Sequence, residues 1–285
     1  MEQGIALYAR QHHHSHALLY GQDPGVTCLS GAALVLWYLG YPDQAFKKSN
    51  EALTLAQELP HPFSLAFALI WAGQLHQLRW EVRFAQERAE ALMVLADEQG
   101  FAEVLAMGIG LRGWALVEQG QGEEGITEIR RSLEAFRAIE VELWRSYAVV
   151  LLAEMYGKEG QAEEGLNVLT EALAVVDKNE SRWYEAELYR LKGELTLAQS
   201  GVQSLASRDQ KEVEECFWKA IKIARRQQAK SLELRAVVSL SRLWQQQGRR
   251  DEARQMLAEV YGWFTEGFDT ADLQEAKALL AALAK

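Results

Sequence analysis

The sequence predicts an all-α protein, a superhelix of about six to seven helical hairpins, and two observations support this prediction. Five small residues recur at intervals of 40 inside segments with helical patterning: Ala33, Gly73, Gly113, Ala153 and Gly193. Self-similarity at a fixed period indicates a solenoid, in which each hairpin buries its apolar faces by stacking on its neighbours. Apolar residues three and four apart also occur in every unit, and no segment shows the sustained alternation of a half-buried strand.

A second column of small residues follows the first by 12 positions, at Ala45, Ala85, Gly125 and Gly165. Turn glycines stand between the columns at 40, 120 and 160, whereas unit two has Trp80 there. After Gly193 both columns slip by eight residues, so that the second column of unit five falls at Val213 and the first column of unit six at Ser241. One inserted loop at 200–210 explains both slips, because Ser241 and Ala253 restore the spacing of 12 around Gly248.

The columns place six units in order at about 26–59, 62–99, 101–139, 142–176, 181–226 and 231–261. Pro42 and Asp43 open the second helix of the first unit, since proline in the first helical turn sacrifices no hydrogen bond. A terminal capping helix is predicted over 270–285, with Asp269 or Thr270 as its N-cap. Its apolar face is formed by Leu273, Ala276, Leu279 and Leu280. We expect one continuous domain over 1–285, since a solenoid grows by repetition.

The first residues predict a partial repeat over 1–25. Residues 2–8 resemble the end of a unit's second helix, and no first helix precedes them. Repeat arrays normally cover their terminal stacking face with a polar cap. We therefore expect an excised fragment or the product of a shortened gene, and a homo-oligomer formed through this uncapped face is an alternative.

Composition excludes several classes of partner. The chain has 40 acidic and 30 basic residues, a net charge of −10, which disfavours direct nucleic-acid binding because phosphate contacts need clustered Lys and Arg. No apolar stretch reaches the roughly 18 to 20 residues of a membrane span. Cys28 and Cys216 lie far apart, without a metal or redox spacing, and are predicted to be reduced core residues in a cytoplasmic protein.

No motif for catalysis, a metal or a cofactor is present. The dense histidine cluster is His12, His13, His14 and His16, and no carboxylate or cysteine accompanies it in the same turn, so we predict no metal. No phosphate-binding loop, His-Glu-x2-His motif or nucleophile–base set is found. Gly108, Gly110 and Gly113 fall within a helix, where tight helix packing is favoured over close approach of a partner.

Candidate binding residues follow from the expected geometry, in which first helices line a concave groove. They lie one turn either side of the small column. The groove candidates are Phe67, Ile70, Gln74, Gln77, Met107, Trp114, Tyr147, Glu154, Glu187, Arg190, Glu194, Arg235 and Arg242. Such a groove suits an amphipathic or basic peptide, with Trp114 as aromatic anchor and Glu154, Glu187 and Glu194 as charge partners. Packing of Met107, Trp114 and Tyr147 between adjacent first helices is the alternative.

The aligned units resemble the tetratricopeptide repeat. Unit four carries the pattern in Leu152, Ala153 and Tyr156, followed by Gly165 and Ala172. The repeat is 40 residues long, in place of the usual 34, as in the sensor regions of large bacterial signalling ATPases. Segments 160–165, 182–195 and 228–236 look like the carboxy-terminal repeat region of bacterial ATPases, some joined to class III nucleotide cyclases. This resemblance implies a regulatory region of a multidomain protein and carries over no catalytic residue.

The leading hypothesis is therefore a non-catalytic scaffold that binds a protein or peptide segment, or another domain of the same parent protein. The first alternative is a small-molecule sensor, because the similar regulators include one that responds to an oligosaccharide and Trp114, Trp144 and Trp183 offer rings for stacking on sugars. Self-association through the incomplete first repeat is the second.

Overall fold

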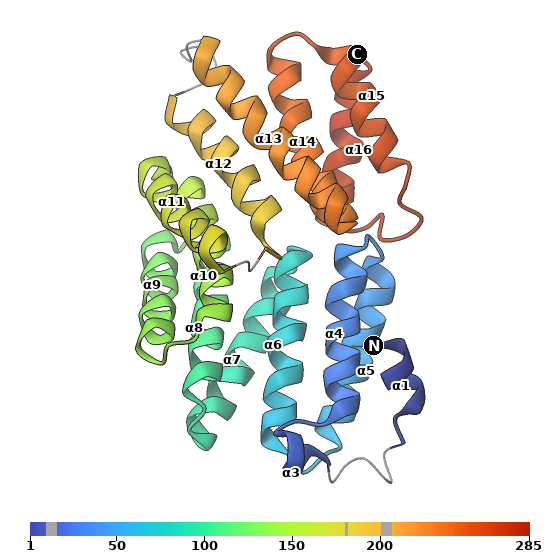
Figure 1. The fold of residues 1–285 in the computed structure, drawn as a ribbon, viewed down its shortest axis with the longest axis vertical. Coiled ribbons are helices and arrows are strands. Elements are labelled where there is room, and N and C mark those ends of the chain that lie inside the picture. The colour runs from blue at the N-terminus through green and yellow to red at the C-terminus, as the bar shows by residue number, and fades with distance from the viewer. Residues whose placement is uncertain (10–15, 180–181, 201–206) are drawn as a thin grey trace. The chain divides into compact units, whose positions relative to one another are not determined.

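The computed structural model describes residues 1–9, 16–179, 182–200 and 207–285, and every regular element in these ranges is a helix (Figure 1). The chain divides into two compact units, which are described separately. The amino-terminal unit comprises Met1–Trp37 and Tyr41–Val141, and the carboxy-terminal unit comprises Tyr38–Gly40 and Glu142–Lys285. No described helix is both long enough and apolar enough to cross a membrane.

The first two helices of the amino-terminal unit are short, and the repeats follow them. The short helices are α1 (Glu2–Leu7) and α3 (His16–Tyr20). The repeats contribute α4 (Pro24–Tyr38), α5 (Pro42–Gln57), α6 (Pro62–Leu78), α7 (Val82–Gln99), α8 (Ala102–Glu118) and α9 (Gly122–Ala138). Pro42 occupies the first turn of α5, as predicted. Helices α5 to α9 each pack on the next along the chain, which is the contact pattern of stacked hairpins.

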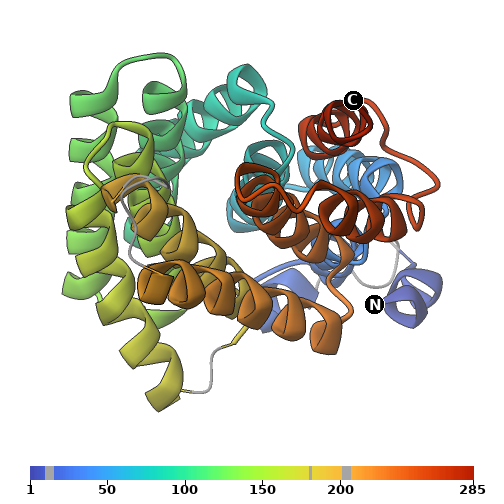
Figure 2. The same cartoon turned by 90° about the horizontal axis from the view of Figure 1, so that it is seen from above.

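The carboxy-terminal unit continues the same alternation. Its helices are α10 (Glu142–Lys158), α11 (Ala162–Asn179), α12 (Glu185–Ser200), α13 (Ser207–Gln227), α14 (Lys230–Gln246), α15 (Arg250–Tyr261) and α16 (Ala271–Leu283). Each packs on the next, and α12, α14 and α16 also pack on one another in turn (Figure 2). Of the predicted loop at 200–210, residues 201–206 lie outside the described residues. The prediction is wrong at its ends, because Ser200 belongs to α12 and residues 207–210 belong to α13.

The small columns mark where the two helices of a hairpin approach most closely. Gly113 on α8 faces Gly125 on α9, and a β-carbon on either would collide with the carbonyl oxygen of the other. In the same way Ala153 faces Gly165, and the Ser241 hydroxyl donates a 3.4 Å hydrogen bond to the Ala253 carbonyl. Small side chains are required there because helix backbones meet without room for larger ones.

The neighbouring glycines of α8 also serve packing, which is the favoured of the two predictions. Gly108 lies against Met93 and the Ala89 carbonyl of α7. Gly110 lies against Ser132, whose hydroxyl donates a 2.7 Å hydrogen bond to the Ala106 carbonyl. The close contact between α8 and its neighbours compensates for the poor helix propensity of these glycines.

The turn glycines between the two helices of a hairpin have the left-handed backbone conformation. Gly120, Gly160 and Gly248 have φ angles of 86°, 74° and 81°, which glycine adopts without steric penalty. Trp80 takes the same place in its hairpin with φ of 61°, an unfavourable conformation for a bulky residue. Its ring packs 6.0 Å from that of Trp114, a contact that glycine lacks.

The predicted capping helix is present as α16, and Thr270 rather than Asp269 is its N-cap. The Thr270 hydroxyl donates a 2.7 Å hydrogen bond to the Gly267 carbonyl and does not cap an α16 amide. Leu273, Ala276 and Leu279 are buried in the core of the carboxy-terminal unit, and Leu280 is partly buried against it. The apolar face of α16 was therefore predicted correctly.

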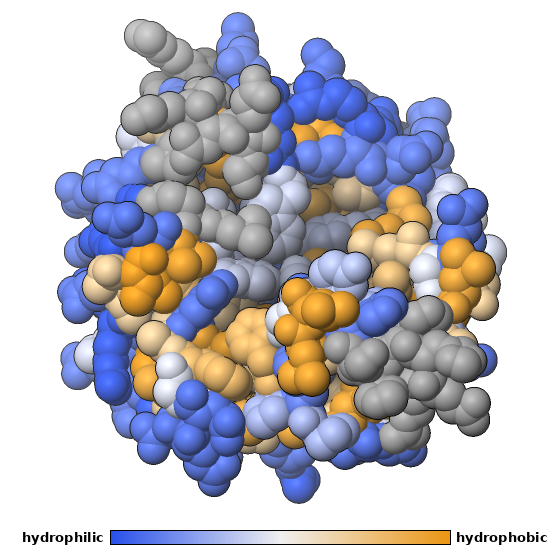
Figure 3. Space-filling model, turned by 60° about the horizontal axis from the view of Figure 1, so that its bottom comes forward, coloured by the Kyte–Doolittle hydropathy of each residue, from blue (hydrophilic) through white to orange (hydrophobic). Residues whose placement is uncertain are grey.

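Several large hydrophobic side chains remain at the surface. On α3 these are Leu18, Leu19 and Tyr20, and on α7 they are Phe84 and Val94. On the face drawn in Figure 3, hydrophobic side chains form separate patches among hydrophilic ones. Scattered apolar exposure is ordinary for a soluble surface, whereas a contiguous run such as residues 18–20 is a candidate contact surface.

Candidate functional site

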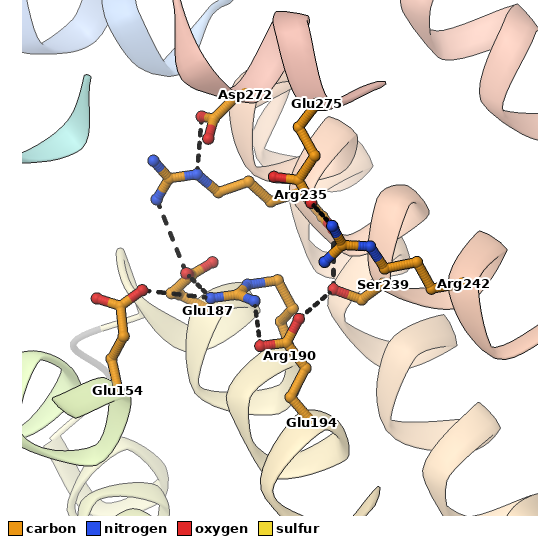
Figure 4. Close-up of polar contacts among 9 residues, drawn as sticks. All are labelled: Glu154, Glu187, Arg190, Glu194, Arg235, Ser239, Arg242, Asp272 and Glu275. Atoms are coloured by element: carbon orange, nitrogen blue, oxygen red, sulfur yellow. Dashed lines mark hydrogen bonds and ion pairs between the residues drawn. The ribbon is translucent and has the colours of Figure 1, made fainter. Parts of the chain in front are cut away.

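A cluster of charged side chains lies among the first helices of the carboxy-terminal unit (Figure 4). Helix α10 contributes Glu154, α12 contributes three residues, α14 contributes three and α16 contributes two. The members, here called the charged cluster, are Glu154, Glu187, Arg190, Glu194, Arg235, Ser239, Arg242, Asp272 and Glu275. On each helix they are three, four or seven positions apart, so they share one face. The stacking of the helices brings these faces together.

Arg190 is the central cation of the charged cluster. Its Nη2 donates a 2.5 Å hydrogen bond to Glu187 Oε1, and its Nη1 lies 2.6 Å from Glu194 Oε2. The Arg190 side chain is only 9% exposed. Burial by itself lowers the pKa of Arg190, but the carboxylates of Glu187, Glu194 and Glu154 raise it well above its ordinary value. Arg190 is therefore charged in the folded protein.

Glu187 is buried yet ionised. Burial by itself raises the pKa of its carboxyl, but the opposing effect of Arg190, together with that of Arg235 at 3.8 Å, is larger and lowers it. Arg235 in turn donates a 2.8 Å hydrogen bond from Nε to Asp272 Oδ2 on α16. A buried ion pair offsets its desolvation only when several hydrogen bonds accompany it, as they do here.

The edge of the charged cluster reaches solvent. The side chains of Arg242 and Glu275 are 55% and 40% exposed and form a 2.6 Å ion pair. Glu194 is 37% exposed, and it accepts a 2.6 Å hydrogen bond from the Ser239 hydroxyl. The charged cluster therefore consists of a buried ionic base and a rim of polar side chains that reaches solvent.

The charged cluster has more negative than positive charge. It contains five carboxyl groups, on Glu154, Glu187, Glu194, Asp272 and Glu275, and three guanidinium groups. Glu154 is neutralised least: its Oε1 lies 3.9 Å from Arg190 Nη2. Burial, opposed by Arg190 and reinforced by Glu187, raises the pKa of Glu154 to about 7. Carboxyl groups therefore outnumber guanidinium groups in the charged cluster.

The carboxy-terminal unit contains seven groove candidates, and all of them except Tyr147 belong to the charged cluster. Tyr147 is buried beside it, 5.7 Å from the ring of Tyr184, and burial raises the pKa of the Tyr147 hydroxyl well above its ordinary value. Sequence reasoning missed Ser239, Asp272 and Glu275. The positions of Asp272 and Glu275, three apart on the polar face of the capping helix, were the available signal.

The groove candidates of the amino-terminal unit are not an exposed surface. Ile70, Gln74, Gln77 and Met107 are buried, Phe67 is half-buried and Trp114 is fully buried. Trp114 lies in contact with Trp80, so it has no face available to anchor a peptide. Met107, Trp114 and Tyr147 instead pack within the interior, which was the alternative to a place in the groove. Trp144 is buried as well, and this leaves Trp183 alone among the three rings considered for sugar stacking.

The histidine cluster cannot be placed, since His12, His13 and His14 lie outside the described residues. Among the described residues, no group of three or more His, Cys, Asp or Glu side chains is arranged to hold a metal ion. Cys28 and Cys216 are both free thiols, and Cys216 is buried.

Comparison with known proteins agrees with this architecture. A family model described as anaphase-promoting complex subunit 5 matches residues 9–79 and 201–285. No curated protein matches the chain by sequence. Among solved structures, NprR in complex with its cognate peptide NprX is 14% identical, with a TM-score of 0.63 over 99% of this chain and 75% of that chain.

Two Rap structures are also similar. The apo form of RapI is 13% identical with a TM-score of 0.59, covering 90% of this chain and 84% of that chain. A Rap protein complexed with competence and sporulation factor is 15% identical with a TM-score of 0.57, covering 90% and 79%. At this identity the likeness concerns the fold, which is a tetratricopeptide-like helical solenoid.

Proposed function

Because the chain belongs to the family described as anaphase-promoting complex subunit 5 and has a tetratricopeptide-like fold, we propose that it is a non-catalytic scaffold that binds a protein or peptide segment. The observation that carries this proposal is the charged cluster, a set of ionic side chains on stacked first helices with an exposed edge. The similar NprR and Rap structures that hold NprX and competence and sporulation factor support it by analogy of fold.

The charged cluster is better suited to binding than to stabilising the fold. A buried ion pair often contributes no more stability than well-packed apolar residues would. In the charged cluster, carboxyl groups outnumber guanidinium groups at a partly buried site. This excess of negative charge is complementary to a cationic partner. We therefore assign the partner a basic or amphipathic segment that contacts Glu194, Arg242 and Glu154.

The context in which this scaffold works is a regulatory one. The partner segment lies in another protein or in another domain of the same parent protein. The resemblance of segments 160–165, 182–195 and 228–236 to the repeat regions of bacterial signalling ATPases and nucleotide cyclases supports such a parent. A protein of that kind works in the cytoplasm, and this location is part of the proposal.

Peptide selection tests the proposal. Peptides selected from a displayed random library on the full chain are measured by fluorescence anisotropy against the wild type, Glu194→Gln and Arg242→Gln. Since interface hot spots exceed about 1 kcal/mol, we expect at least one cluster variant to weaken binding about tenfold with unchanged helicity. The control is Arg83→Gln, whose side chain is exposed on α7. Unchanged affinity in both cluster variants would contradict the assignment of the site.

Self-association is a second candidate function, favoured by the exposed Leu18, Leu19 and Tyr20 of α3. An apolar run of this kind is a candidate surface for a second copy of the chain. Light scattering on the Leu18→Glu, Leu19→Glu double variant tests it, with the exposed Val94→Glu of α7 as control. We expect a smaller mass for the double variant only. A monomeric wild type would eliminate this candidate.

A further inference from the structure

Glu154 is the carboxylate of the charged cluster that the protein's own groups satisfy least. Its side chain is 13% exposed, and no described residue donates a hydrogen bond to it. The cation beside it, Arg190 Nη2, is 3.9 Å away, whereas Arg190 lies 2.5 Å from Glu187 and 2.6 Å from Glu194. Burying a carboxylate without a close donor is unfavourable, so such a group is a candidate for contact with a ligand.

The Arg190 guanidinium has one hydrogen-bond donor without an acceptor in the described part of the chain. Its Nε–H is buried, and no acceptor among the described residues receives it. The Arg190 side chain is more than nine-tenths buried. An unsatisfied buried donor and an incompletely satisfied buried acceptor thus lie on neighbouring helices, α12 and α10. Because the Arg190 Nε atom is closed to solvent, a ligand can reach only the Glu154 carboxylate, whose side chain is 13% exposed.

We propose that this site binds a lysine of a peptide partner, with Glu154 receiving the lysine ammonium. This inference rests on the proposed function and names the residue that is recognised. A lysine fits better than an arginine because a compact ammonium on a flexible stem can reach a carboxylate that is mostly buried, whereas a planar guanidinium needs wider access. It also brings the five carboxylates and three guanidinium groups closer to neutrality.

The proposal predicts that binding depends on pH. The charged and titratable groups that face Glu154 are Tyr147 on α10, Glu187, Arg190 and Glu194 on α12, and Arg235 on α14. Because burial raises the pKa of Glu154 to about 7, about half of the free molecules carry a protonated Glu154 at pH 7. The ammonium requires the ionised form, so binding at pH 7 releases about half a proton per molecule on average. Apparent affinity should then fall about fivefold between pH 7 and pH 6.

The test uses peptides selected on the wild-type chain at pH 7.5. Each lysine of a selected peptide is replaced by norleucine, which keeps the aliphatic stem and removes the charge, and by acetyl-lysine. Affinities are measured for the wild type, Glu154→Gln and the control Glu87→Gln, an exposed carboxylate on α7. The free diamine 1,5-diaminopentane is tested as a competitor. Because norleucine removes the charge from the peptide, the loss of affinity measured in the wild type does not depend on the folding of a variant.

We expect one lysine whose replacement by norleucine weakens binding at least tenfold in the wild type and in Glu87→Gln, but less than twofold in Glu154→Gln. This difference should shrink as the pH falls to 6. Selected peptides without such a lysine, or an equal loss in Glu154→Gln, would overturn the inference and leave the proposed function intact. If 1,5-diaminopentane bound as tightly as the peptide, the inference of a peptide lysine would be overturned, and a small free amine would be the ligand. Failure of cluster variants to affect any peptide would reject the proposed function itself.

Discussion

Replacement of Gly113 by alanine tests the explanation of the small columns. A β-carbon at position 113 would lie 2.6 Å from the Gly125 carbonyl oxygen, 2.8 Å from Ile129 Cγ1 and 3.0 Å from the Ile129 amide nitrogen. Non-bonded atoms prefer about 3.5–4.0 Å. Two of these three atoms belong to the α9 backbone, which cannot rotate away, so α8 and α9 must separate.

Two opposing effects set the size of the change. Overpacking of this kind destabilises by about 1–3 kcal/mol, while alanine in place of glycine within a helix contributes about 1 kcal/mol in favour of folding. Because backbone atoms are involved, we expect the upper part of the first range and a net loss of about 2 kcal/mol. Gly73→Ala is the matched control at the same repeat position, where a β-carbon would chiefly meet the flexible end of the Leu111 side chain. Its change should be below about 1 kcal/mol.

The measurement is urea denaturation followed by circular dichroism, combined with hydrogen exchange of peptides from α8 and α9. Hydrogen exchange is needed because a chain with two compact units need not unfold in a single transition. The Gly113→Ala variant should lose protection in α8 and α9 at lower urea than Gly73→Ala does. The packing explanation is refuted if Gly113→Ala is as stable as Gly73→Ala or more stable.

Three further predictions concern charge and backbone strain. Because burial raises the pKa of Glu154 from its ordinary 4.5 to about 7, its contribution to stability is lost as pH rises through 7. Glu154→Gln should then be up to about 3 kcal/mol more stable than the wild type at pH 8, with the difference vanishing near pH 4.5 in urea melts. Glu140→Gly should stabilise the fold by about 1 kcal/mol, because glycine relieves the positive φ of 56° at this position. Trp80→Gly should destabilise it, because it removes the contact with the Trp114 ring. Urea melts that show both variants stabilised, or both destabilised, would contradict this explanation. Arg190→Met should cost about 3–5 kcal/mol by leaving buried carboxylates unpaired, against less than about 1 for the exposed Arg83→Met, and thermal melts compare the two.

Much of the fold could be predicted from the sequence because repeat packing is local. The pairing of Gly113 with Gly125 and of Ser241 with Ala253 depends on a hairpin whose helices are consecutive in the chain, so a spacing of 12 residues is sufficient to reveal it. The pairs of helices that form units one to six lie close to the predicted ranges of those units for the same reason. The expectation of a single continuous domain stays a prediction.

The candidate site could be predicted only in part. A position one turn from the small column is known from sequence, but whether its side chain is exposed depends on how far the next first helix lies away. That distance depends on contacts between side chains far apart in sequence, such as the contact of Trp80 with Trp114. Neither this contact nor the strained turn at Trp80 could be predicted from the sequence. Hence Trp114 and Met107 were proposed for a groove and lie in the interior.

Periodicity in the chain was thus enough to establish the class of fold, the approximate ranges of the units and the faces that meet within each hairpin, because these follow from interactions between neighbours along the sequence. The charged cluster needed the folded molecule. Glu154, Arg190, Arg235 and Asp272 come from four different helices, and their spacing along the chain contains no common motif. Only the stacking of α10, α12, α14 and α16 brings their charges within a few ångströms, where burial strengthens each interaction and leaves Glu154 without a close partner.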